Sequence, residues 1–179
     1  MSERQRLFVA LDLPADVRGA LAGWAERAAP QGVRRVPEEN LHVTLAFLGS
    51  RSREEAEAVA ALLPVVAAPV GELRTAGALW LAPRPPGVLT VALEPSDRIA
   101  ALHRSLAGAL ADAAGYAPEQ RRVRAHVTVA RVPRGARVRV REPTEQPPEL
   151  AFAPAGLTLY RSRTGPGGSR YEPLARAEL

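Results

Sequence analysis

The sequence predicts an α+β protein made of two pseudo-symmetric halves. Short apolar segments typical of strands, such as 7–11 and 88–93, alternate with segments whose apolar residues recur at helical spacing, such as 15–28 and 96–114. The order strand, helix, strand occurs twice, and the last strand of each unit has the pattern His-x-Thr-x-Ala. A chain of 179 residues can form one sizeable core. We therefore expect a single domain, 1–179, in which about 7–49 and 88–132 are equivalent.

The two units align along their length. Leu7–Asp12 aligns with Leu89–Glu94 at an offset of 82, and His42 aligns with His126 at an offset of 84. Short apolar matches are common by chance, so neither alignment alone would be decisive. The joint order is more specific, because the only two His-x-Thr triplets fall at equivalent places. Duplicated units often pack about a pseudo-two-fold axis, which would bring both histidines to one cleft.

The other elements follow from local signals. Ser52 and Glu55 have the capping-box spacing and should open a helix that Pro64 limits. Gly49 should end the strand at about 41–48, and Gly115 the helix at 96–114. The segment 73–81 is a further expected strand, and 157–162 and 170–174 are expected strands joined by a Gly- and Pro-containing turn at 164–168.

The two motifs, Leu41–Phe47 and Ala125–Arg131, are the candidate site. Side chains alternate between the two faces of a strand, so His, Thr and Ala at i, i+2 and i+4 should share one face. In the first motif this predicts that Ala46 floors the site and that Phe47 points to the core. The same rule places Arg131, five residues after His126, away from the site unless the strand bulges there.

This residue set suits metal-free cleavage of a phosphodiester. An unperturbed histidine has a pKa of about 6.5, so one copy, His42 or His126, can accept a proton while the other donates one. Thr44 and Thr128 supply neutral donors for the phosphate oxygens. A metal site is disfavoured because the only other histidine is His103 and there is no cysteine. Two buried structural histidines are the simpler alternative.

Composition sets the remaining limits. The net charge is +5, and every basic side chain is an arginine, which suits an anionic partner but is also typical of a GC-rich genome. No apolar run approaches membrane-spanning length, so we expect a cytoplasmic protein that binds no membrane. We also expect a monomer that binds no metal or cofactor. Arginines near the second motif either attract an RNA backbone or form a solvated face; they are Arg121, Arg122, Arg124, Arg134, Arg137, Arg139 and Arg141.

With these residues the chain resembles the two-histidine (2H) phosphoesterases, in particular the RNA 2',3'-cyclic phosphodiesterases, also called 2'-5' RNA ligases. The resemblance rests on four segments: 6–14, 39–49, 126–131, and the closing pair 159–162 with 168–171. It implies two α+β lobes, each with an antiparallel sheet that contributes one motif to a central groove, and helices on the outer faces. The implied substrate is RNA with a 2',3'-cyclic phosphate end or a small cyclic nucleotide, and the implied product is a 2'-phosphomonoester.

The resemblance also implies a role for each site residue. His42 would be the proton donor to the leaving 3' oxygen, and His126 the proton acceptor from water. Thr44 and Thr128 would hold the phosphate, and Arg131 matches an arginine of the family that could bind it.

The chain departs from the family pattern near both motifs. Arg35 stands where a tryptophan commonly follows an arginine, Ala125 where a proline is common, and Val123 where an aromatic residue is frequent. These changes remove no catalytic group but leave open what stacks on the bases. Phe8 is a candidate platform, although its apolar strand favours packing in the core.

Two functions of different classes remain open on sequence grounds. The first is a cyclic phosphodiesterase, a hydrolase that could also run the reverse joining of 2'-5' linkages. The second is a nucleotide- or RNA-end-binding module without significant turnover. The paired histidines favour the enzyme, because binding alone does not need a matched proton donor and acceptor.

Overall fold

The structure, a computed structural model, describes residues 4–81, 87–117, 124–133, 135–136, 138, 142–165 and 168–179. The helices are α1 (Ala15–Ala28), α2 (Arg53–Val66) and α3 (Asp97–Ala114), with a short 3-10 helix, η1 (Glu38–Asn40). The strands are β1 (Gln5–Asp12), β2 (Arg34–Arg35), β3 (His42–Arg51), β4 (Leu73–Leu81), β5 (Val88–Leu93), β6 (His126–Arg131), β7 (Ala151–Phe152), β8 (Gly156–Gly165) and β9 (Gly168–Ala177).

The strands form one antiparallel sheet whose order is mirrored about its centre. The order is β7-β4-β5-β6-β3-β1-β8-β9, and β2 adds to β6. The equivalent strands β6 and β3 meet in the middle, and the equivalent β5 and β1 lie outside them. At the centre Val43 pairs with Val127, which occupies the same place in the second unit. The α+β fold with two pseudo-symmetric lobes is confirmed, and the repeat boundaries 7–49 and 88–132 stay a prediction with which this order agrees.

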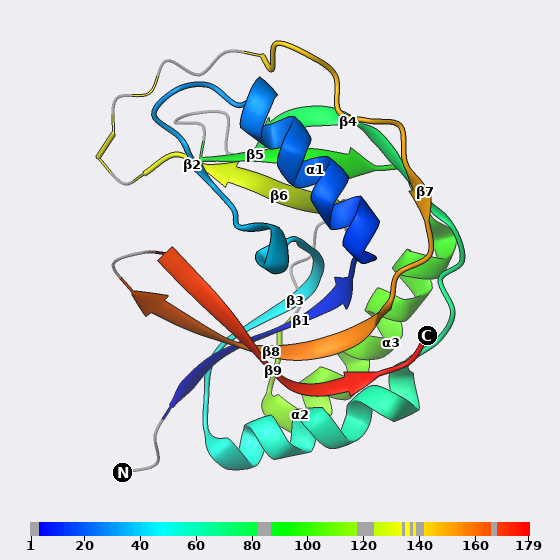
Figure 1. Ribbon diagram of the computed structural model, residues 1–179. Helices are drawn as coiled ribbons and strands as arrows, with labels where there is room; N and C mark the ends of the chain where they lie inside the picture. Colours follow the sequence, from blue (N-terminus) through cyan, green and yellow to red (C-terminus); the bar gives the residue numbers. More distant parts are fainter. Residues whose placement is uncertain are drawn as a thin grey trace.

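Each unit's helix covers the sheet of the other unit. Helix α1 follows β1 but packs against β6, and α3 follows the equivalent β5 but packs against β3 and α2. In Figure 1, α1 crosses the upper lobe, while α2 and α3 lie beneath the lower lobe. Val17, Leu21 and Trp24 of α1 and Leu102 and Leu106 of α3 are buried at these contacts. The exchange makes one core from both units, so the lobes have a fixed relation and the central strands are held together.

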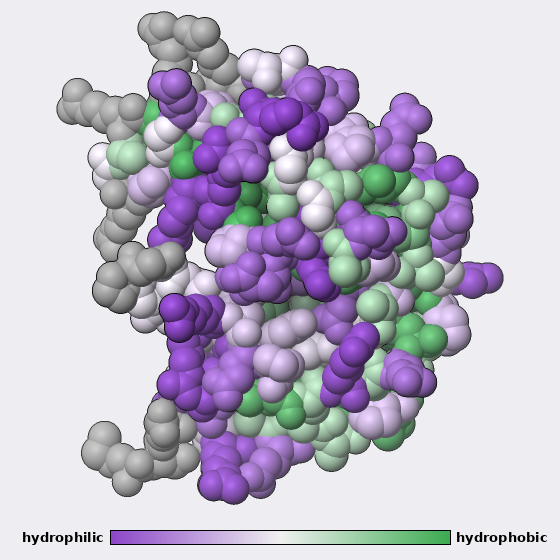
Figure 2. All heavy atoms as spheres, viewed as in Figure 1, coloured by the Kyte–Doolittle hydropathy of each residue, from purple (hydrophilic) through white to green (hydrophobic). Residues whose placement is uncertain are grey.

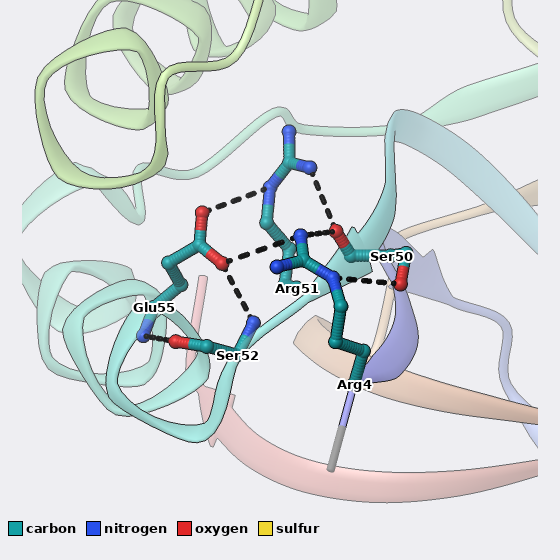
Figure 3. Close-up of polar contacts among 5 residues, drawn as sticks. All are labelled: Arg4, Ser50, Arg51, Ser52 and Glu55. Carbon is teal, nitrogen blue, oxygen red and sulfur yellow. Dashed lines mark hydrogen bonds and ion pairs between the residues drawn. The ribbon is translucent and has the colours of Figure 1, made fainter. Parts of the chain in front are cut away.

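The helix boundaries show which local signals were sufficient. The capping box opens α2 as predicted: Glu55 N donates to Ser52 Oγ at 3.2 Å, and Ser52 N donates to Glu55 Oε2 at 2.6 Å. Figure 3 shows that Arg4 and Arg51 reach the same carboxylate and the nearby Ser50. This cluster ties the N-terminal strand and the end of β3 to the start of α2.

Two predicted endings are wrong. Helix α2 runs past Pro64 to Val66, because a proline removes only its own N–H donor, and beyond it the N–H of Ala67 still donates to Leu63 O at 2.9 Å. Strand β3 continues through Gly49, which has φ 72° beside a bulge, to Arg51. The predicted stop of α3 is confirmed, since Gly115 takes the left-handed conformation at φ 57°. Among the described residues, no helix is long and apolar enough to cross a membrane.

Candidate active site

The central strand pair places both His-x-Thr motifs side by side. Val43 and Val127 face each other with no exposed surface, so their neighbours on either side project from the opposite face of the sheet. In an antiparallel pair this register sets His42 towards Thr128 and Thr44 towards His126. The structure therefore brings together the four polar side chains that the sequence singled out.

His42 is held by two hydrogen bonds. Its Nδ1 lies 2.7 Å from the carbonyl oxygen of Asn40, and its Nε2 lies 3.0 Å from Thr44 Oγ1. Because a carbonyl oxygen can only accept, Nδ1 carries the hydrogen and Nε2 accepts from the threonine hydroxyl. Asn40 is itself buried, and its Nδ2 donates to Ser169 O at 2.9 Å. The start of β9 thus fixes the residue that orients the first imidazole.

His126 is oriented in the same way. Its Nδ1 lies 2.7 Å from the carbonyl oxygen of Arg124, again two residues earlier in the chain. The bond fixes the tautomer with hydrogen on Nδ1, and Nε2 remains the nitrogen that can exchange a proton with a substrate. The two imidazoles therefore have equivalent backbone anchors and the same reactive atom.

An aromatic cluster packs around His42. Phe8 stacks on its ring at a centroid distance of 4.9 Å, and Tyr171 meets it edge-on at 5.3 Å. Tyr160 also stacks on Phe8, at 5.2 Å, and its ring centroid lies 6.3 Å from that of His42. Phe8 is only 3% exposed, so the expected packing role is confirmed, although the packing is against the site histidine. The ring therefore offers almost no surface on which a base could stack.

This burial changes the proton affinity of His42. The pKa falls to about 4, chiefly because burial disfavours the charged ring, with further lowering by Arg131 and His126. The Asn40 carbonyl and the carboxylate of Asp12 oppose the shift. In the free protein near neutral pH the His42 ring is therefore uncharged.

Asp12 lies beside His42 and anchors a polar network that the sequence reasoning missed. It pairs with His42 in the β1–β3 register, and its carboxylate accepts from Thr158 Oγ1 and from Tyr160 Oη, both at 2.7 Å. Arg176 Nε completes an ion pair with it at 3.2 Å. Burial and the bond to Asp12 raise the pKa of Tyr160. The signal was present, because Asp12 and Tyr160 lie in segments that carry the family resemblance.

A β-bulge in each central strand overturns two predicted orientations. In β3 the partners of Val9 and Ala10 are Ala46 and Thr44, so Leu45 is an extra residue. The side chains beyond it change face: Ala46 is 3% exposed and does not floor the site, whereas Phe47, predicted in the core, is 69% exposed.

The equivalent bulge occurs in β6. The partners of Thr90 and Leu89 are Thr128 and Ala130, which leaves Val129 as the extra residue. Ala130 is fully buried, so it does not floor the site either. Arg131 is turned to the site face, where its charge acts on His42. The alternation of side chains along a regular strand would have placed Arg131 on the opposite face.

Phe47 and Arg131 occupy equivalent positions, 84 residues apart, and meet at one hollow. It measures about 340 Å³ and is also lined by Phe8, Tyr171 and Arg6. The exposed aromatic ring and the guanidinium lie at the end of the site where β1, β3 and β6 meet the β8–β9 hairpin. Figure 2 shows that, among the residues drawn in colour, those along the left side of the molecule are mainly hydrophilic.

A second cavity, of about 350 Å³, adjoins His126. It lies between the site face of β4–β5 and the first turn of α3. No feature of the sequence predicted this cavity.

Several candidate residues lie elsewhere or cannot be placed. His103 is half-buried on α3, and burial lowers its pKa. Within the described ranges, no three His, Asp or Glu side chains gather as a metal site, and the expectation of no metal stays a prediction. Arg124 is exposed beside His126. Val123 and the other arginines of the expected cluster lie outside the described residues. These arginines are Arg121, Arg122, Arg134, Arg137, Arg139 and Arg141.

Comparison with known proteins agrees with this geometry. The chain is 33% identical to the RNA 2',3'-cyclic phosphodiesterase of Escherichia coli (strain K12), over 100% of this chain and 99% of that protein. It is 47% identical to the protein of the same name from Thermus thermophilus over a shorter stretch, 28% of this chain and 26% of that protein. The expectation of a cyclic phosphodiesterase is confirmed by these relatives.

The fold is shared with solved structures. The crystal structure of E. coli LigT in complex with 3'-AMP superimposes with a TM-score of 0.77 at 32% identity, covering 99% of both chains. A crystal structure of a Thermus thermophilus protein gives a TM-score of 0.80 at 29% identity, covering 97% of both chains. A sequence model described as the 2'-5' RNA ligase superfamily matches residues 12–166. The chain therefore belongs to the 2'-5' RNA ligase superfamily.

Proposed function

We propose that this protein hydrolyses the 2',3'-cyclic phosphate at an RNA end to a 2'-phosphomonoester, without a metal ion. The observation that carries the proposal is the central strand pair, which sets two backbone-anchored histidines beside two threonines. The curated relatives are named for this activity. A pure binding module would not need two imidazoles that both keep Nε2 for proton transfer.

The histidines act as an acid and a base on opposite sides of the phosphorus. His126 Nε2 takes a proton from the attacking water, and His42 Nε2 gives one to the leaving 3' oxygen. The water oxygen bonds to phosphorus as the bond from phosphorus to O3' breaks, so one water is consumed and the phosphate stays on O2'. Thr44, Thr128 and Arg131 stabilise the negative charge that develops on the phosphate oxygens.

The low pKa of His42 suits the role of acid once substrate is bound. An anionic phosphate beside the ring favours its protonated form and raises the pKa above the value of about 4 in the free protein. The proton is then held by a half-buried ring that readily releases it to a strongly basic alkoxide. Protonation of His42 accordingly accompanies substrate binding.

The hollow at Phe47 and Arg131 accepts the RNA strand that leads to the cyclic end. Its arginines, Arg6 and Arg131, match backbone phosphates, and the exposed ring of Phe47 offers a stacking surface that any base can use. Phe47 would thus supply a stacking surface for a base, which the arginine at position 35, in place of the family's tryptophan, left open.

A single assay tests the proposal. The protein is incubated with 2',3'-cyclic AMP and excess EDTA, and the products are followed by phosphorus NMR for wild type, His42→Ala and His126→Ala. We expect 2'-AMP from wild type, a bell-shaped dependence of kcat on pH, and a loss of about 10²-fold or more in each variant. Turnover that survives both substitutions would place the reaction elsewhere, and binding without turnover would support the binding module.

A further inference from the structure

We propose that Arg34 and Arg131 form a second phosphate site, which binds the phosphate on the 5' side of the ribose that carries the cyclic end. The inference rests on the proposed function, because it places this site relative to the phosphate that reacts at His42. It assigns a preference among substrates. A terminal nucleotide with a phosphate on its 5' oxygen is preferred over a nucleoside 2',3'-cyclic phosphate.

The two arginines face each other across neighbouring strands. In the β2–β6 register Arg34 is the partner of Arg131. Side chains directly opposite each other in an antiparallel pair share one face, so Arg34 lies on the site face with Arg131. Arg35, the next residue, donates instead to two carbonyl oxygens at the end of α1, at 3.2 and 2.9 Å. Of the two arginines in β2, Arg34 is therefore the one that can meet the substrate.

This arrangement places two positive charges together without a negative partner. Within the part of the chain that the structure describes, neither Arg34 nor Arg131 has an ion pair or a hydrogen bond through its guanidinium. Like charges directly opposite each other on a sheet are destabilising. An anion between them would offset the repulsion, and a guanidinium offers a planar fork of donors that matches the oxygens of a phosphate. The pair therefore favours a phosphate as its ligand.

Both arginines line a small cavity that continues the hollow at Phe47. The cavity measures about 60 Å³ and shares Arg131, Ser169 and Tyr171 with that hollow. Sites for whole small molecules measure about 300–1,000 Å³, so this cavity suits a compact group such as a phosphate and is too small for a base. A nucleotide that occupies the hollow can therefore place one of its phosphates between the two arginines.

The start of β9 lies against the guanidinium of Arg34. A Cβ at Gly168 would lie 3.4 Å from Arg34 Nη1, and Gly168 has φ 113°, so bare backbone passes close to this group. The next residue, Ser169, accepts a hydrogen bond from Asn40, whose own carbonyl oxygen anchors His42. One short segment of backbone thus connects the second phosphate site to the first imidazole.

Arg131 is close to both phosphates. Its charge acts on His42, and it also lines the small cavity. A guanidinium carries five N–H donors, so Arg131 can contact the reacting phosphate and the 5' phosphate of the same nucleotide together. Arg34 lines the small cavity but not the larger hollow, so a change at Arg34 reports on the second phosphate.

The test compares two substrates that differ by one phosphate. The full-length protein is given 2',3'-cyclic AMP or its 5'-phosphorylated form, and kcat/KM for each is measured by liquid chromatography of the products. We expect wild type to prefer the 5'-phosphorylated substrate at least about tenfold, because charge-assisted hydrogen bonds to a phosphate are strong. The ratio of the two values does not depend on the fraction of correctly folded protein.

Three variants locate the origin of this preference. Arg34→Ala should remove most of it, and Arg34→Lys should keep only part, because an ammonium group lacks the planar fork. Arg104→Ala is the matched control, since Arg104 is an exposed arginine on α3, and it should keep the preference of wild type. Overall attraction by positive charge would instead affect Arg34→Ala and Arg104→Ala equally.

A binding measurement separates the site from turnover. The expected products are 2'-AMP and adenosine 2',5'-bisphosphate, and calorimetry gives their affinities for wild type and for the three variants. The bisphosphate should bind wild type at least about tenfold more tightly, and Arg34→Ala should remove most of this difference.

The possible outcomes distinguish this inference from the proposed function. An equal preference in wild type and Arg34→Ala, or an equal loss in Arg34→Ala and Arg104→Ala, would overturn the inference. Hydrolysis of both substrates with equal kcat/KM by wild type would reject the second site and leave the proposed hydrolysis intact. Absence of hydrolysis, with the bisphosphate still bound more tightly through Arg34, would reject the proposed function alone.

Discussion

Around His42 the site face is filled, whereas around His126 the same face is open. Phe8 stacks on the first ring and Tyr171 closes its edge, while the second ring borders a cavity of about 350 Å³. Both rings nevertheless keep the same anchor, a bond of 2.7 Å from Nδ1 to the carbonyl oxygen two residues earlier. The backbone geometry is thus common to the halves, and the difference lies in the neighbouring side chains.

The comparison shows how a repeated unit can supply two different proton-transfer groups. A half-buried ring packed against aromatic side chains resists charge, and this lowers the pKa of His42 to about 4. A ring beside open volume can meet an incoming nucleophile. The division of roles that we propose, with an acid in the closed half and a base in the open half, comes from the family resemblance, and the difference in packing is compatible with it.

The largest expected effect separates the two roles directly. In a cyclic substrate with sulfur in place of O3', the leaving thiolate is weakly basic and does not need a proton. We expect His42→Ala to recover most of its loss, which is about 10²–10⁴-fold with the natural substrate, and His126→Ala to recover little. Steady-state rates with both substrates measure this. Equal rescue of both variants, or rescue of His126→Ala alone, would contradict the assignment.

The burial of His42 should also appear in stability. The folded pKa of about 4 lies below the unfolded value of 6.5, so between these values the unfolded chain binds a proton that the folded chain does not. Stability should therefore fall as the pH falls from 6.5 towards 4, by about 3 kcal/mol in total from this residue, with no contribution above 6.5.

His42→Gln removes this contribution and leaves the carboxylates, which titrate over the same pH range, unchanged. The difference between wild type and variant therefore isolates the contribution of His42. Urea unfolding of wild type and variant at about pH 7 and about pH 4.5 measures the difference. Relative to wild type, the free energy of unfolding of the variant should be higher at the lower pH than at the higher pH. A gap that stays constant would mean that the ring is not closed off from water.

The carboxylates at the two equivalent strand ends offer a third comparison. Asp12 accepts hydrogen bonds from two hydroxyls and pairs with Arg176, whereas its counterpart Glu94 is exposed. Hydrogen bonds to a charged group contribute about 1.5–3 kcal/mol. We expect Asp12→Asn to destabilise the protein by about that amount, and Glu94→Gln by no more than about 0.5 kcal/mol. Thermal unfolding of the two variants at one pH would show the difference, and similar losses would contradict it.

The sequence was sufficient for the fold because each unit repeats a simple pattern. Periodicity placed α1 at Ala15–Ala28, the capping box of Ser52 and Glu55 placed the start of α2, and Gly115 placed the end of α3, because these signals depend on neighbours in the chain. The repeated motif was sufficient to bring His42 and His126 together, since equivalent strands meet at the axis. These features are local or symmetric, and both properties can be read from one sequence.

The remaining site residues depend on contacts between distant strands. The bulges at Leu45 and Val129 arise from how β3 and β6 pair with β1 and β5, and no alternation rule within one strand reveals them. Similarly, the Asp12 network needs β8, whose Thr158 lies 146 residues further along the chain. Orientation after a bulge and partners across a sheet are therefore what the sequence reasoning missed.

The smallest expected effect concerns the hollow that Phe47 and Arg131 line together. Phe47 and Arg131 are equivalent in the repeat, and the bulge before each turns it to the same side. An exposed ring that stacks on a base contributes about 1–3 kcal/mol by alanine substitution. We expect Phe47→Ala to lower kcat/KM about tenfold for a short RNA with a cyclic end, relative to its value for 2',3'-cyclic AMP.

Leu174→Ala is the matched control, because Leu174 is also an exposed apolar side chain, at 38%, but lies in another hollow on β9. It should leave the ratio of the two kcat/KM values unchanged. Phe47→Trp should keep or increase the preference for RNA, since a larger ring stacks at least as well. If Phe47→Ala lowers kcat/KM equally for both substrates, the ring supports the site itself, and the RNA strand must follow the open half past His126 instead.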